Sequence, residues 1–391
     1  MKRIYMDHAA TTPVDTEVLD AMKPYFSQKF GNASSMHGYG QEAKRALDES
    51  RTAVAGLIGA KPDDIIFTSG GTESDNLAIK GVVMEANHKS NSKWAKSHII
   101  TSEIEHDAVL LTCKDLEEQG HEVTYLTVDE HGLVDPSDVK KAIQKNTVLV
   151  SIMHANNEIG TIQPIAEIGK ICKAAGVLFH TDAVQAFGKL PIDVKHMGID
   201  LLSASAHKLY GPKGVGCLFI GAGIKLKQQN MGGGHEQGRR SGTENVAGIV
   251  GFAKACELAK KHMDSWSIKE TKLRNYLIKE LLKIPNSQLN GHPEKRLQNN
   301  VNIAFSGIEG ESMVIHLDMN GIAASTGSAC SSKSLEPSHV LLSIGLKPQD
   351  AHGSLRLSLG KDNSKQDADY LIKTLPGIVN NLRKISPFGI I

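Results

Sequence analysis

Short apolar runs alternate with stretches of helical periodicity along the first two thirds of the chain. Strand-like runs end in polar or glycine-containing turns and lie at residues 65–68, 98–102, 122–126, 147–153, 177–180, 201–203 and 215–220. Apolar residues with helical spacing occupy residues 15–29, 41–58, 73–85, 108–118, 136–144 and 165–175. Strands that alternate with helices predict an α/β fold, in which helices cover both faces of a mostly parallel seven-stranded sheet.

The pattern changes after residue 245. Helical periodicity extends over 246–282, and after it come strand-like segments at 301–305, 322–325 and 355–359 and helical ones at 312–319, 338–344 and 366–383. These elements predict a smaller α+β domain. We therefore expect a large domain over residues 15–260 and a small domain formed by residues 1–14 and 261–391, since a chain of 391 residues is long enough for two domains.

Composition and charge exclude several classes of partner. The chain is 40% hydrophobic and 22% charged, and its formal net charge of +1 gives no basis for binding nucleic acid or an anionic membrane. No apolar run approaches the ~18 residues of a membrane span, and the first residues do not resemble a signal peptide. The five cysteines form no C-x-x-C pair, so neither a disulfide framework nor a zinc site is indicated. We expect a cytoplasmic protein with reduced thiols.

The most informative stretch is 203–214, Ser-Ala-Ser-Ala-His-Lys-Leu-Tyr-Gly-Pro-Lys-Gly. Apolar runs on both sides predict a turn between two strands, and Lys208 lies on that turn beside His207, shortly after Ser205. A lysine held on a constrained loop with hydroxyls nearby is suited to bind an aldehyde cofactor as a Schiff base, with the phosphate of the cofactor close by. The alternative interpretation is a solvated surface lysine.

A second stretch, Thr68-Ser69-Gly70-Gly71-Thr72, follows a strand and opens a helix. Unpaired backbone N–H groups at a helix start, together with the hydroxyl of Thr72, favour a phosphate. The stretch matches neither G-x-G-x-x-G nor a P-loop, which disfavours a nucleotide. An ordinary capped turn is the alternative.

Other polar residues follow predicted strands at the same expected edge of the sheet. Asp182 ends one strand and is placed to pair with a charged ring nitrogen, and Gln185 is placed to reach a ring hydroxyl. His106 and Asn157 follow two other strands and are candidates to contact the ring or the substrate. The alternatives are a helix cap for Asp182 and ordinary polar loop residues for the others.

Two further residues are candidates for chemistry. Cys330 lies among serine, glycine and alanine in residues 325–332, the setting of an accessible, reactive thiol on a mobile loop, whereas the other four cysteines have apolar or helical contexts and are expected to be structural. Arg356 is placed to hold a carboxylate with two hydrogen bonds, and a surface arginine is the alternative.

Together with segments 154–160, 232–236 and 240–243, these motifs resemble the cysteine desulfurases, which are pyridoxal-phosphate enzymes of the class V aminotransferase superfamily with fold type I. The resemblance extends over essentially the whole chain. It implies that Lys208 binds pyridoxal 5′-phosphate covalently and that the protein is an obligate homodimer. The other cofactor-binding residues that it implies are Gly71, Thr72, Ser205, His207 and the partner subunit's Thr243 for the phosphate, Asp182 for the ring nitrogen, Gln185 for the ring hydroxyl, and His106 stacked on the ring.

The resemblance also implies a reaction. Asn157 and Arg356 would bind the carboxylate of L-cysteine, His106 and Lys208 would move protons, and Cys330 would take the sulfur as a persulfide and leave L-alanine. The serine-rich segment around Cys330 resembles the group that serves iron–sulfur scaffold proteins, and Cys330 is a candidate ligand for a cluster shared with such a scaffold. A selenocysteine lyase, another class V enzyme and a catalytically idle cofactor-binding scaffold remain alternatives.

Overall fold

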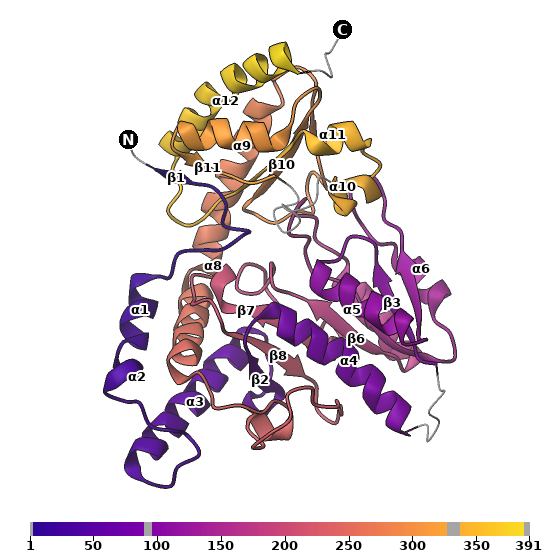
Figure 1. The fold of residues 1–391 in the computed structure, drawn as a ribbon, viewed down its shortest axis with the longest axis vertical. Coiled ribbons are helices and arrows are strands. Elements are labelled where there is room, and N and C mark those ends of the chain that lie inside the picture. The colour runs from indigo at the N-terminus through magenta and orange to yellow at the C-terminus, as the bar shows by residue number, and fades with distance from the viewer. Residues whose placement is uncertain (1–2, 90–95, 327–336, 387–391) are drawn as a thin grey trace.

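The computed structural model of the chain describes residues 3–89, 96–326 and 337–386, and its largest unit is a seven-stranded sheet (Figure 1). The strand order is β2-β8-β7-β6-β5-β3-β4. All strands run in one direction except β8, which is antiparallel to both of its neighbours. The predicted mostly parallel sheet is therefore confirmed. Its strands are β2 (Ile65–Thr68), β3 (His98–Ser102), β4 (Glu122–Leu126), β5 (Thr147–Ser151), β6 (Leu178–Asp182), β7 (Leu201–Ser205) and β8 (Gly216–Ile220).

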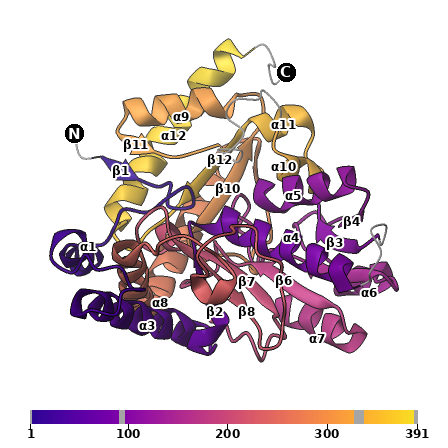
Figure 2. The ribbon, with the colours of Figure 1, turned by 60° about the horizontal axis from the view of Figure 1, so that its bottom comes forward.

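Neighbouring apolar residues of each strand point to opposite faces of this sheet. Ile99 packs in a core cluster with α4 (Gly71–Lys89) and α5 (Asp107–Glu118), whereas Ile100 packs in the cluster on the other face. The same alternation separates Leu201 from Leu202. Side chains from α3 (Gly38–Leu57), α6 (Pro136–Ala142), α7 (Ile165–Ala175) and α8 (Val246–Leu281) fill that second cluster, so helices cover both faces (Figure 2).

The helix predicted over residues 15–29 is divided in the structure. Its first part, α1 (Thr16–Met22), begins after Asp15, whose carboxylate accepts a hydrogen bond from the N–H of Glu17. Its second part, α2 (Pro24–Ser27), begins at Pro24. Proline has no N–H to donate to the preceding turn, so it starts a new helix more readily than it continues one.

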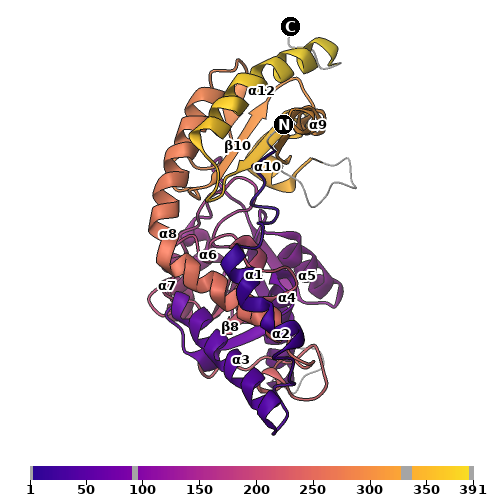
Figure 3. The same ribbon diagram turned by 90° about the vertical axis from the view of Figure 1, so that its left-hand side faces the viewer.

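The small antiparallel sheet has the order β12-β10-β9, and β1 (Ile4–Tyr5) pairs in parallel with β11 (Ile322–Ala323) in a separate two-stranded sheet. The long helix α8 runs from the large sheet to this second region (Figure 3). Its side chains belong to the cores of both. The sequence pattern predicted most of the region but missed β9 and α11. Its other elements are β9 (Ser287–Leu289), β10 (Asn300–Phe305), α9 (Gly310–Met319), α10 (His339–Ser343), α11 (Pro348–His352), β12 (Ser354–Ser358) and α12 (Lys365–Ile385). Within the described residues, no helix is both long enough and apolar enough to span a membrane.

The amino-terminal arm connects the small sheets to the loop of Lys208. After β1, the backbone at Asp7 bridges Ser358 of β12, and the N–H of Thr12 then donates to the carbonyl of His207. The hydroxyl of Thr12 also accepts a hydrogen bond from the N–H of Tyr210, which has a left-handed backbone with a φ of 65°. The arm therefore holds both sides of the Lys208 turn.

A buried ion pair fixes the glycine-rich segment that precedes α8. The guanidinium of Arg51 in α3 donates to both carboxylate oxygens of Glu236, at 2.7 and 2.8 Å, and to the carbonyl of Ile65. The N–H of Phe67 donates to Glu236 as well, at 2.9 Å. Glu236 thus joins a helix, the edge strand β2 and a loop.

Replacing Arg51 should destabilise the fold strongly. Arg51→Met leaves the carboxylate of Glu236 buried without its counter-ion, and we expect a loss of about 3–5 kcal/mol in the free energy of unfolding, measured by denaturant titration. The control is Lys44→Met, which removes the exposed pair with Asp48 and should change that free energy by less than about 1 kcal/mol. Equal stability of the two variants would contradict this assignment.

Candidate active site

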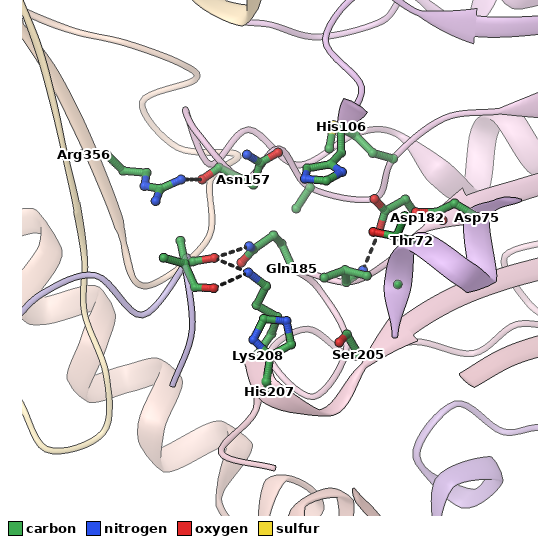
Figure 4. A pocket seen from close by; sticks show the side chains of 16 residues that line it. Thr72, Asp75, His106, Asn157, Asp182, Gln185, Ser205, His207, Lys208 and Arg356 are labelled. Atoms are coloured by element: carbon green, nitrogen blue, oxygen red, sulfur yellow. Dashed lines mark hydrogen bonds between the residues drawn. The ribbon is translucent and has the colours of Figure 1, made fainter. Parts of the chain in front are cut away.

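One cavity at the carboxyl edge of the large sheet brings together nearly all of the predicted site residues (Figure 4). Its volume is about 340 Å³. The strands β2, β3, β5, β6 and β7 run in the same direction, and each of them leads into a segment that lines the cavity. The predicted residues that line it are Gly71, Thr72, His106, Asn157, Asp182, Gln185, Ser205, His207, Lys208 and Arg356.

Lys208 occupies the turn between β7 and β8, as predicted, in a short 3-10 helix (Ala206–Lys208). Its ammonium donates hydrogen bonds to the carbonyls of Ala9 and Ala10 in the amino-terminal arm, at 2.6 and 2.7 Å. The amide nitrogen of Gln185 donates to the same carbonyl of Ala9 at 2.9 Å. Lys208 is therefore not a solvated surface residue, because its ammonium is bound by the arm and its side chain lines the cavity.

Two buried carboxyl groups lie side by side at one end of the cavity. Asp182 is the last residue of β6 and accepts a hydrogen bond from the N–H of Val184 at 2.8 Å, so it closes a turn and caps no helix. Burial raises the pKa of Asp182, and the neighbouring His106 opposes this rise. Burial also raises the pKa of Asp75 in α4, well above its usual range, and the charge of Asp182 adds to that rise. The low-dielectric surroundings therefore favour one negative charge on the pair over two.

Groups that are suited to bind an anion lie where α4 begins. Gly71 is the first residue of this helix, and a Cβ atom there would lie 2.6 Å from a methyl carbon of Val184, so only glycine lets the helix start so close to the loop after β6. The hydroxyls of Thr72 and Ser205 line the same cavity. Burial and, next, the charge of Lys208 lower the pKa of His207 to about 4, so its ring is neutral near pH 7. Helix N–H groups with neutral donors beside them suit a phosphate.

His106 and the adjacent Glu105 lie between the ends of β3 and β5. His106 precedes α5 and accepts a hydrogen bond from the N–H of Ala108 on its Nδ1 atom, at 3.1 Å. The adjacent Glu105 is fully buried and accepts hydrogen bonds from the hydroxyl of Ser102 and the N–H of Met153, at 2.6 and 3.0 Å. Burial raises the pKa of Glu105 to about 8. This network fixes the backbone from which the ring of His106 faces the cavity.

Arg356 in β12 forms the side of the cavity that the small sheet contributes. It is 3% exposed, which contradicts the alternative of a surface arginine. Its Nη1 and Nη2 atoms donate to the carbonyl of Asn157 and to the carboxylate of Asp7, at 3.1 and 3.0 Å. Its Nε atom is buried without a hydrogen-bond partner among the described residues. A guanidinium with unused donor capacity in a cavity suits a carboxylate ligand.

Two predicted residues are not among the described residues that line this cavity. Thr243 is exposed and does not line it. Cys330 belongs to residues 327–336, which lie outside the described residues, and so does its suggested role as an iron–sulfur ligand. The other cysteines are buried free thiols, as expected of structural residues: Cys113, Cys172, Cys217 and Cys256. Within the described part of the chain, no group of three or more His, Cys, Asp or Glu side chains is arranged to hold a metal ion.

The sequence interpretation missed two parts of the site. Asp75 lies three residues after Thr72, on the same face of α4, and this helical spacing could have identified it. Ala9 and Ala10 contribute backbone carbonyls, which carry no signal in the sequence because any residue provides them.

The charges of the cavity fit pyridoxal 5′-phosphate. The cavity is lined by a helix start with neutral hydroxyl donors, which suits a phosphate, by buried carboxyl groups able to pair with a ring nitrogen, and by Lys208, whose ammonium contacts the arm. The Oδ1 atom of Asp75 lies 3.6 Å from Nε2 of His180 in β6, which holds this second carboxyl group beside Asp182. The residues present are therefore those that this cofactor requires.

Comparison with known proteins identifies the family. Residues 4–371 match the family model described as aminotransferase class-V. The chain is 54% identical over 390 residues to "Cysteine desulfurase IscS" of Dictyoglomus turgidum, covering 99% of this chain and 98% of that protein. It is also 54% identical over 386 residues to the protein of the same name from Methanosarcina thermophila, covering 99% and 94% of the two chains.

Solved structures agree with these sequences. A structure described as a NifS-like protein superposes with a TM-score of 0.89 at 38% identity, covering 97% of this chain and 100% of that one. A structure described as SspA in complex with cysteine has a TM-score of 0.80 at 39% identity, covering 91% and 98% of the two chains. The chain belongs to the aminotransferase class-V family and, within it, to the cysteine desulfurases.

Proposed function

We propose that the enzyme removes sulfur from L-cysteine, with Lys208 as the cofactor lysine and Cys330 as the sulfur acceptor. The observation that supports these roles best is the convergence of ten predicted residues on one cavity, where Lys208 shares the space with Asp182 and Arg356. Cysteine desulfurases of this family use pyridoxal 5′-phosphate, which supplies an aldehyde that captures amines and a ring that accepts electrons.

Different side chains of the cavity bind the substrate and transfer protons. Arg356 and Asn157 bind the carboxylate of the substrate, which orients its amino group towards Lys208. Lys208, which here donates to backbone carbonyls, is the group that removes the proton from Cα and later returns a proton to the product. His106 covers the ring and moves protons on its side of the cavity. Together these groups hold the substrate in one orientation.

The sulfur then moves to the enzyme. The thiolate of Cys330 attacks the sulfur of L-cysteine, a new S–S bond forms as the carbon–sulfur bond breaks, and the carbon takes a proton to give L-alanine. The persulfide on Cys330 passes its outer sulfur to an acceptor, and the serine-rich segment around Cys330 supports an iron–sulfur scaffold as that acceptor, with Cys330 also able to ligate a cluster shared with it. A reactive thiol of this kind favours a cytoplasmic enzyme, where thiols stay reduced.

The proposal includes a homodimer in which Thr243 completes the phosphate site of the partner subunit. Thr243 is exposed, and the segment that carries it is held in place by Arg240, which donates to Glu73 in α4 at 2.8 Å. Because the hydroxyl of Thr243 is exposed and does not line the cavity of its own subunit, its position supports a role in the cavity of the partner subunit. The separate core cluster of the small sheet likewise supports the division of the chain into residues 15–260 and residues 1–14 with 261–391.

Two substitutions separate cofactor binding from sulfur transfer. Cys330→Ala should keep the yellow, covalently bound cofactor but reduce sulfide release from L-cysteine with reductant to background, because the sulfur has no acceptor. Lys208→Ala should lose the borohydride-sensitive absorption band. Absorbance spectra and a sulfide assay measure both. Full sulfide release by Cys330→Ala would disprove the assigned nucleophile, and a coloured wild type without sulfide release would indicate a selenocysteine lyase, another class V enzyme or an idle scaffold.

Arg356 should determine affinity for the substrate carboxylate. Arg356→Gln removes charge-assisted hydrogen bonds, and we expect kcat/KM for L-cysteine to fall about 10- to 100-fold, mostly through KM. Inhibition by L-alanine, which has the same carboxylate, should weaken in parallel, while the absorption band of the cofactor stays. Arg383→Gln is the control, since Arg383 donates to the carbonyl of Ser306 and does not line the cavity. An unchanged KM in Arg356→Gln would contradict the role.

The proposed role of Thr243 predicts that its replacement weakens cofactor binding. Thr243→Ala should dimerise normally in size-exclusion chromatography but release the cofactor faster during dialysis, because the phosphate loses one hydrogen-bond donor. Thr52→Ala serves as the control, since its hydroxyl donates to the carbonyl of Asp48 within α3. A monomeric wild-type enzyme that holds its cofactor would refute the proposed shared site.

A further inference from the structure

Glu158 carries a buried carboxyl group that the proposed mechanism does not use, although it follows Asn157 directly in the sequence. Glu158 is 6% exposed, and its Oε2 atom accepts a hydrogen bond from the hydroxyl of Ser338 at 2.6 Å. Ser338 is 5% exposed and is the N-cap of α10, where the N–H of Leu341 donates to its hydroxyl oxygen at 3.2 Å. A serine needs no carboxyl group in order to cap a helix, so the cap does not account for the cost of burying Glu158.

The backbone of Glu158 is held by three asparagine side chains. Its carbonyl accepts hydrogen bonds from the amides of Asn300 and Asn302 in β10, both at 3.0 Å. Its N–H donates to the Oδ1 atom of Asn156 at 2.8 Å, and the amide of Asn156 donates to the carbonyl of Ile104 at 2.8 Å. The hydroxyl of Ser338 is therefore bound to a side chain whose own backbone is fixed.

The first residue of α10, His339, binds the loop that precedes α5. Its Nε2 atom lies 3.0 Å from the carbonyl oxygen of Glu105. A carbonyl oxygen can only accept a hydrogen bond, so Nε2 carries the proton and donates it. Glu105 precedes His106 and Glu158 follows Asn157, and both of these neighbours line the cavity. The start of α10 is thus hydrogen-bonded directly beside two cavity-lining residues.

The chain before Cys330 is attached to the same part of the cavity. The N–H of Arg356 donates to the carbonyl of Ser325 at 2.8 Å, and the N–H of Ser325 donates back to the carbonyl of Arg356 at 3.2 Å. Arg356 itself donates to the carbonyl of Asn157 (Figure 4). Cys330 lies outside the described residues, but the described residues that precede and follow its segment are both bonded beside the groups proposed to bind the substrate carboxylate.

Apolar packing places α10 without fixing its exact position. Val340 and Leu341 are buried in one cluster with Ile104 and Ile159. Such contacts are non-directional, whereas the hydrogen bond between Ser338 and Glu158 requires a particular distance and angle. Loss of this bond should therefore leave the fold intact and loosen the start of the helix.

We propose that Glu158 and Ser338 are positioning residues for sulfur transfer, because their hydrogen bond connects the chain that follows Cys330 to the loop that carries Asn157. The inference rests on the proposed role of Cys330 as the sulfur acceptor. A thiol and a substrate held by the same fixed backbone react faster than a loosely tethered pair, since less freedom is lost on reaching the transition state. The asparagines bind the backbone of Glu158, so replacing its side chain leaves the loop of Asn157 in place.

The test compares persulfide formation on Cys330 with the binding of L-alanine, which has the carboxylate of the substrate but no sulfur. The rate of persulfide formation is measured in a single turnover of the holoenzyme with L-cysteine and no reductant, by quenching and mass spectrometry. Affinity for L-alanine is measured from the change that it causes in the absorption band of the holoenzyme. The variants are Glu158→Met, Glu158→Gln, Ser338→Ala, Ser338→Thr and the double variant with Glu158→Met and Ser338→Ala. Ser364→Ala is the control for the loss of a helix cap, because Ser364 caps α12 and does not line the cavity.

We expect persulfide formation to slow about tenfold in Glu158→Met and in Ser338→Ala, and by no more than this in the double variant, because both substitutions remove the same bond. Affinity for L-alanine should stay unchanged in all of them. Glu158→Gln and Ser338→Thr should recover the rate, since the first keeps an acceptor oxygen and the second keeps the hydroxyl. Ser364→Ala should form the persulfide at the wild-type rate.

Wild-type rates of persulfide formation in both Glu158→Met and Ser338→Ala would overturn the proposal. An equal loss of affinity for L-alanine would also overturn it, because the whole cavity would then be distorted. If Glu158→Met does not fold, Ser338→Ala against Ser338→Thr decides the same question. Failure of the proposed function is a different result, since Cys330→Ala would then still release sulfide.

Discussion

The common direction of six strands is the constraint on which the site depends. Parallel strands deliver their carboxyl ends to one edge, so residues from positions 71 to 208 meet there although more than a hundred residues separate them in sequence. The reversed strand β8 matters as much as the parallel ones. Because it returns directly alongside β7, the turn between them stays at the same edge, and that turn carries Lys208.

Burial of polar groups determines the chemistry at this edge. Asp75, Asp182 and Glu105 are all buried carboxyl groups whose pKa values are raised, and His207 is a buried imidazole whose pKa is lowered. In each case the desolvation of the charged form is the largest cause. A fold selected for stability alone would replace such groups by apolar ones, so their concentration around one cavity indicates that the fold accepts this cost for function.

The sequence predicted the large sheet better than the site. The bounds of β2 and β3 agree with the predicted runs because these strands are buried along their whole length and end at polar turns, and those of the partly exposed edge strand β4 agree because its polar and apolar residues alternate. The division at Pro24 and the short elements β9 and α11 were missed, since a few residues carry too little periodicity. The arrangement of β9 and α11 in space is set by packing between segments that are distant in the sequence.

The residues of the site that the sequence interpretation missed were missed for different physical reasons. Ala9 and Ala10 act through backbone carbonyls, so the type of residue at these positions does not reveal the role. Asp75 lines the cavity with its side chain, and its helical spacing from Thr72 could have identified it. Side chains proposed to contact the ligand directly, such as Asp182 and Arg356, must have a particular chemistry and were identified from it. Residues that orient those side chains become visible only when the fold brings them together.

The amino-terminal arm shows how the two halves of the site are joined. Its Asp7 accepts a hydrogen bond from Arg356 of the small sheet, and two residues later its carbonyls accept from Gln185 and Lys208 of the large sheet. These contacts of one short segment thus fix the spacing between Arg356 and Lys208. Because neither sheet alone sets that spacing, the site depends on the arm for its geometry as much as on the strands that supply its side chains.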